Sequence, residues 1–112
     1  MFRMFGRLSN SIKQDNEVKK AVEIIQQVIG TKVDDLTIQR LHNHARDMVQ
    51  FNRSMNAYEY AFYSLFHQYI EGEKNDIDDS LKNKIIVNFF SLVALGNIKN
   101  DYLIDLYTNA QR

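Results

Sequence analysis

Three histidines and two pairs of adjacent aspartates are the side chains in this chain that could hold a metal ion or move a proton. His42 and His44 are two residues apart, so on a helix their imidazoles point about 200° apart and cannot share one ion. His67 and Glu71 have the i, i+4 spacing of two ligands on one helix face, but a di-iron bundle needs several such pairs. The sequence therefore predicts no metal site and no cofactor.

Catalysis by a nucleophile or by paired carboxylates is not expected either. The chain has no cysteine, and none of its serines lies in a Gly-x-Ser-x-Gly turn. The pairs Asp34–Asp35 and Asp78–Asp79 lie where helices are expected to begin, and a carboxylate at that position caps the helix. We therefore expect a protein that is not an enzyme.

Tyr60, Tyr63 and His67 recur at i, i+3 and i+7, which places them along one flank of a helix. Side chains with an apolar body and a polar tip are enriched at protein interfaces. This stripe is the first candidate for a partner-binding surface. The alternative is that the three side chains are half-buried against a neighbouring helix.

The first 14 residues form a basic segment, with Arg3, Arg7 and Lys13 and no acidic residue. On a helix, its apolar residues gather on one side: Met1, Phe2, Met4, Phe5, Leu8 and Ile12. This profile is typical of an interfacial helix and, less closely, of a mitochondrial presequence. We favour docking of this segment on the domain or on a neighbouring copy, with Phe2, Phe5, Arg3 and Arg7 as candidate contact residues.

Composition places the chain among ordinary globular proteins of one domain. It has 112 residues, 45% of them hydrophobic and 25% charged, and its formal net charge is zero. The charge is uneven, since residues 1–53 carry nine basic and six acidic residues and the remainder carries five and eight. The longest apolar stretch, residues 85–95, is far shorter than the roughly 20 residues of a membrane span. A cytoplasmic location is the expectation.

Glycine marks where the helices stop, because Gly30, Gly72 and Gly96 each follow a helical pattern in a chain without proline. The patterns predict helices over residues 17–29, 35–51, 57–71 and 80–95, and a short last helix that begins at Asn97 or Asn100. Asn16 is the expected N-cap of the first, and Thr31 with Asp34 gives a T-x-x-D start for the second.

The third helix has the clearest start signal, because Asn56 and Glu59 fit a capping box. The predicted fold is an all-α single-domain bundle of about five helices, with 57–71 and 80–95 at its centre and 1–14 as an N-terminal amphipathic segment. The expected core is apolar and aromatic: Phe62, Phe66, Ile86, Phe89, Phe90 and Val93.

These features favour a small non-enzymatic regulatory protein, such as an inhibitor, an adaptor or an immunity-type factor, that binds another protein. Its apolar area is large for five helices, so a homodimer is expected. The alternative is a helix-turn-helix-like DNA-binding regulator, because two helices flank a break at residues 51–55. It is not favoured, because helix 57–71 would be the recognition helix and has no Lys or Arg for base edges.

Overall fold

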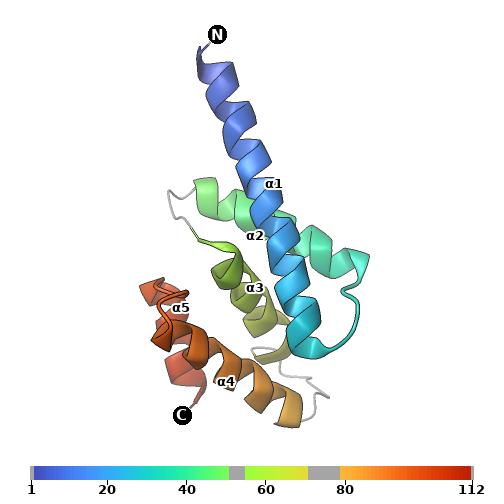
Figure 1. Ribbon diagram of the computed structural model, residues 1–112, viewed down its shortest axis with the longest axis vertical. Helices are drawn as coiled ribbons and strands as arrows, with labels where there is room; N and C mark the ends of the chain where they lie inside the picture. The colour runs from blue at the N-terminus through green and yellow to red at the C-terminus, as the bar shows by residue number, and fades with distance from the viewer. Residues whose placement is uncertain (1, 51–54, 71–78, 112) are drawn as a thin grey trace.

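Every regular element that the structure describes is a helix (Figure 1). The computed structural model describes residues 2–50, 55–70 and 79–111, and for residues 2–14 and 48–50 it describes the backbone alone. The elements are α1 (Phe2–Ile29), α2 (Asp35–Gln50), α3 (Ala57–Leu65), the π-helical turn η1 (Phe66–Ile70), α4 (Asp79–Ala94) and α5 (Asp101–Ala110). The predicted all-α bundle of about five helices is confirmed.

α1 is one helix of 28 residues, so the predicted separate helix capped by Asn16 is wrong. An N-cap residue needs extended backbone, whereas Asn16 lies inside the helix, and the polar residues before it include no proline that would break it. The first turns of α1 extend past the other helices and end at the N-terminus (Figure 1). The backbone of this segment therefore does not fold back on its own domain, which corrects one of the two docking sites expected for it. Docking on a neighbouring copy stays a prediction.

The helix ends follow the sequence signals where the structure describes them. Gly30 and Gly96 have φ values of +77° and +81°, the left-handed conformation that closes a helix at low cost only for glycine. Gly72 lies outside the described residues. The start of α2 has the cap predicted for the Asp34–Asp35 pair, because the Asp34 Oδ1 accepts from the Thr37 N–H at 2.8 Å. The T-x-x-D start from Thr31 is not the one used.

α3 lies at the centre of the bundle, with α1 and α2 on one side and α4 on the other (Figure 1). The capping box of Asn56 and Glu59 is confirmed, with both reciprocal hydrogen bonds at 2.9 Å. The predicted single helix 57–71 is corrected at its end, because the chain widens into the π-helical turn η1 from Phe66. Such turns are frequent at functional sites, and η1 carries His67.

The core is aromatic at its middle, as predicted. Phe62 and Phe89 are fully buried and Phe66 and Ile86 nearly so. Tyr107 of α5 stacks on Phe89 with ring centroids 3.8 Å apart and donates its hydroxyl hydrogen to the Phe62 carbonyl.

Two predicted core positions are corrected, because α4 covers the bundle with one face only. Phe90 and Val93 are half-buried on the flanks of α4. Asn100, one of the two expected caps, is the N-cap of α5 and accepts from the Leu103 N–H at 3.0 Å.

Candidate functional site

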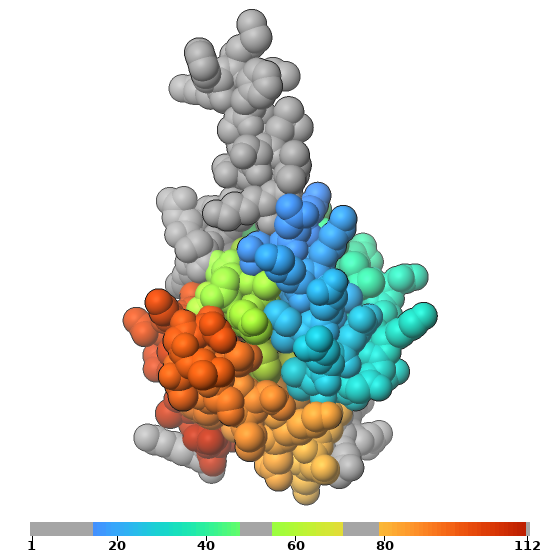
Figure 2. All heavy atoms as spheres, viewed as in Figure 1, coloured from blue at the N-terminus to red at the C-terminus, as the bar shows by residue number. Residues whose placement is uncertain are grey.

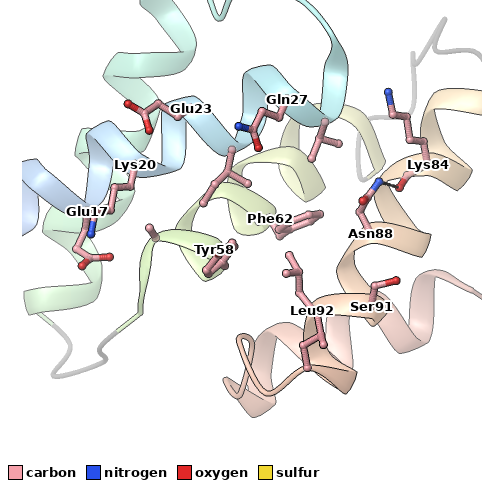
Figure 3. Close-up of a pocket in the computed structure, with 14 residues that line it drawn as sticks. Glu17, Lys20, Glu23, Gln27, Tyr58, Phe62, Lys84, Asn88, Ser91 and Leu92 are labelled. Carbon is pink, nitrogen blue, oxygen red and sulfur yellow. Dashed lines mark hydrogen bonds between the residues drawn. The ribbon is translucent and has the colours of Figure 1, made fainter.

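A groove of about 830 Å³ separates α1 from α4, and the first turns of α3 form its floor. Figure 2 presents its two walls on one face of the molecule, α1 in blue and α4 in orange, with α3 between them. Ala57, Tyr58 and Phe62 come from α3, and the aromatic rings of the last two point into the space between the walls (Figure 3).

Each wall of the groove is one face of a helix. The α1 wall repeats at helical spacing through Glu17, Lys20, Ile24 and Val28. The α4 wall has the same spacing. Its residues are Lys84, Asn88, Ser91 and Leu92 on the helix and Leu95 just after it. Each wall runs over twelve residues of the chain, and the eleven steps between its ends rise about 16 Å in a helix. The groove is therefore a trough about three turns long.

The floor and one end of the trough are apolar. Ile24, Val28, Phe62 and Leu92 line its lower part. Leu95 is 73% exposed and Tyr58 is 37% exposed, and both are among the large apolar side chains that the described surface leaves open to water. An apolar floor with exposed apolar residues at its edge is the composition of a contact surface rather than of a solvated face.

The rim of the trough carries charges of both signs. Glu17 and Glu23 stand on the α1 wall with Lys20 between them, and Lys84 stands on the α4 wall (Figure 3). Two acidic and two basic side chains give the rim no net charge. It therefore favours no anionic or cationic ligand by field alone.

A buried carboxylate holds together the two chain segments at the end of the trough near Leu95. Glu59 is 6% exposed, and its Oε2 accepts from the backbone N–H groups of Lys99 at 2.9 Å and Asn100 at 2.6 Å. The Asn56 amide donates to the Asn97 carbonyl at 2.7 Å in the same loop. The start of α3 is thereby tied to the connection between α4 and α5. The sequence predicted the local capping box, but it carried no signal for these bonds across 40 residues.

A cluster of imidazole and phenol rings joins α2 to the central helix. His44 of α2 meets Tyr63 edge-on, with ring centroids 5.0 Å apart, and lies 5.6 Å from His67 of η1. Tyr63 and His67 are 4.5 Å apart. Among the described residues, the buried Nδ1 of His44 has no hydrogen-bond partner. Burial lowers the pKa of His44, and the neighbouring His67 lowers it further.

The predicted stripe of Tyr60, Tyr63 and His67 is only partly a surface. Tyr60 is 5% exposed and belongs to the core, so its predicted place in a partner-binding surface is wrong. Tyr63 and His67 are half-buried against α2, which agrees with the alternative interpretation. Helical spacing placed the three residues on one flank but could not place α2 beside it. Partner binding by Tyr63 and His67 stays a prediction.

The other candidate contact residues, Phe2, Arg3, Phe5 and Arg7, lie on the helical backbone of α1, and their side chains are outside the described part of the chain. The sequence did not predict the trough. No sequence pattern pairs α1 with α4, and the one hint was Leu95 at the end of a stretch that is apolar on nearly all sides.

The described residues bear on three other possibilities: a metal site, a membrane span and a DNA recognition helix. No group of three or more His, Asp or Glu side chains stands together there in a way that could hold a metal ion, and Glu71 is outside the described part. Within the same residues, no helix combines the length and apolarity needed to cross a membrane. α3 is buried on most sides, which argues against its use as a DNA recognition helix.

Comparisons with protein-family models, with curated proteins and with solved structures gave no match to this chain.

Proposed function

We propose that this protein is a small non-enzymatic regulatory protein that binds a helix of a partner protein in the trough between α1 and α4. The observation that supports this proposal is the trough itself, with its apolar floor and its exposed Leu95 and Tyr58. An inhibitor, an adaptor or an immunity-type factor acts in this way, by occupying or presenting a protein surface.

A helix is the occupant that fits the shape and chemistry of the trough. Its walls are two helix faces, so a third helix can lay one apolar face between them and keep its polar side in water. Anchors at i, i+3 or i+4, and i+7 span about 10 Å, which fits within the length of the trough. The mixed charges of the rim would then set orientation and partner choice more than affinity.

Leu95 is the best position at which to test this proposal, because it is exposed and its substitution should leave the fold intact. The probe is a set of labelled amphipathic peptides of about 14 residues, with acidic, basic and neutral polar faces, measured by fluorescence anisotropy. We expect saturable binding of at least one peptide to the wild-type chain. Leu95→Glu should weaken that binding at least tenfold, since it places a charge beside the apolar floor.

The matched control is Leu36→Glu. Leu36 is 56% exposed on α2 and does not line the trough, so the same change there should leave peptide binding within twofold of wild type. Equal effects of the two substitutions, or no binding of any peptide, would contradict the proposal.

A further inference from the structure

The sequence of α1 places two sets of apolar positions on different sides of one helical backbone. Val18, Ala21 and Ile25 form the buried stripe toward α3. At about 100° per residue, positions 5, 8 and 12 lie roughly 150° around the helix axis from that stripe. Because α1 is unbroken between the two segments, the N-terminal stripe does not extend the core.

The N-terminal part of α1 extends away from the other helices, so we expect its apolar stripe to bind a surface outside this domain. The first turns of the helix extend beyond α2–α5 (Figure 1), and the molecule is 51 Å long against 28 and 24 Å in its other dimensions. A helix that runs out of the bundle without a break does not bring its first residues back to that bundle. Contacts of these apolar positions are therefore expected outside the bundle, with a second copy, another partner or a lipid surface.

The basic charge of the segment favours a lipid surface over a second copy of the chain. The segment contains Arg3, Arg7 and Lys13 and no acidic residue, so the same stripe of a second copy would meet it with like charge. The trough rim of a second copy carries two acidic and two basic residues and offers no net attraction. A bilayer with anionic headgroups offers negative charge and an apolar interior together, which is what a basic amphipathic helix binds.

We propose that the N-terminal half of α1 is an interfacial helix that lies on anionic membrane surfaces. Phe2, Phe5, Leu8 and Ile12 would enter the headgroup boundary. Arg3, Arg7 and Lys13 lie outside the apolar stripe, on the polar side of the helix, and their charge would attract the segment to the negative surface potential of anionic lipid. Because the core stripe of α1 is on the opposite side of the helix, the bundle stays on the aqueous side of the membrane. With three basic residues and one short stripe, binding is reversible and sensitive to salt. This proposal does not depend on the trough between α1 and α4.

The test is co-sedimentation of the full chain with large vesicles of phosphatidylcholine alone or with 30% phosphatidylglycerol. We expect binding to the anionic vesicles at 50 mM NaCl and at least fivefold weaker binding to neutral vesicles or at 500 mM NaCl. The double variants Arg3→Glu/Arg7→Glu and Phe5→Ser/Ile12→Ser should each bind at least tenfold more weakly. The control Lys32→Glu/Lys99→Glu makes the same change in net charge at exposed lysines of the bundle and should lose less than threefold.

A tryptophan reporter separates membrane entry from other effects, because the chain has no tryptophan. In Phe5→Trp, emission should shift to shorter wavelength on anionic vesicles, whereas Leu36→Trp should not shift. Equal binding to neutral vesicles, equal losses in the lysine control, or an unshifted Phe5→Trp would overturn the proposal. So would a dimer that the Phe5→Ser/Ile12→Ser change dissociates while vesicle binding persists, or binding to random duplex DNA in place of vesicles.

Discussion

Glu59 does more than its place in a capping box requires. One carboxylate oxygen accepts from the Asn56 N–H, and the other accepts from the Lys99 and Asn100 N–H groups. A buried acceptor with three backbone donors holds two segments of the chain together, and those donors would lose their partner if it were replaced.

Glu59→Gln should lower the free energy of unfolding by about 1–3 kcal/mol, because an amide replaces one acceptor oxygen with a donor that faces backbone N–H groups. Urea unfolding followed by circular dichroism measures this loss. Glu23→Gln, an exposed position on the trough rim, should change stability by no more than about 0.5 kcal/mol. Similar losses at the two positions would mean that the contacts of Glu59 with the loop contribute little.

The environment of His44 predicts that stability depends on pH. Its pKa in the folded protein is lowered by burial and by His67, against an opposing effect of Asp47, so the unfolded chain binds a proton at this residue more readily. The stabilisation is complete above the ordinary histidine pKa of about 6.5 and is lost as the pH falls toward the lower folded value.

We therefore expect the free energy of unfolding to fall between pH 7 and pH 5, and His44→Gln to flatten that part of the profile. Urea unfolding at half-unit pH steps measures the slope. His42→Gln is the control, because His42 lies near Asp15 at the surface rather than in the ring cluster. A profile that His42→Gln flattens as much as His44→Gln would show that the cluster is not its source.

At the scale of the elements, α4 is a helix with one buried face and one open flank. Phe89 is fully buried between Phe62 and Tyr107, whereas its neighbour Phe90 is half-buried. Adjacent residues of the same type on one helix thus differ in environment, and they provide a matched pair for testing which face of α4 meets the core.

Phe89→Ala should cost about 3–5 kcal/mol, the usual loss for a fully buried phenylalanine, and Phe66→Ala should fall in the same range. Phe90→Ala should cost clearly less, because solvent already reaches its ring. Thermal melts of the three variants give the order directly. If Phe90→Ala were the most destabilising of them, the orientation of α4 would be wrong.

At the scale of the whole molecule, the exposed apolar residues are spread over several helices. Leu36, Val87 and Leu95 are all more than half exposed. Apolar residues exposed singly are normal on a monomer, so these positions do not by themselves indicate association. The homodimer expected from the sequence stays a prediction.

Sedimentation velocity at micromolar concentration should give a species near twice the 13.2 kDa of the chain. Tyr63→Ala is a better probe of the predicted tyrosine interface than a double change with Tyr60, because Tyr60 is in the core and its loss would destabilise the fold. If Tyr63 contacts the second subunit, its truncation should weaken the dimer by about 2 kcal/mol or more. A clean monomer in the wild-type chain would remove the expectation.

The sequence by itself determined what depends on neighbouring residues along the chain. The left-handed ends at Gly30 and Gly96, the capping box of Asn56 and Glu59, and the helical class of the fold follow from backbone conformation and helical periodicity, which act over a few residues. Only the tertiary structure decided what depends on which helices are neighbours. It buried Tyr60, left Phe90 on a flank, connected Glu59 to the loop at Lys99 and opened the trough between α1 and α4. These outcomes depend on how the helices pack around α3. An amphipathic pattern shows which side of a helix is buried, but it does not show which other helix covers that side.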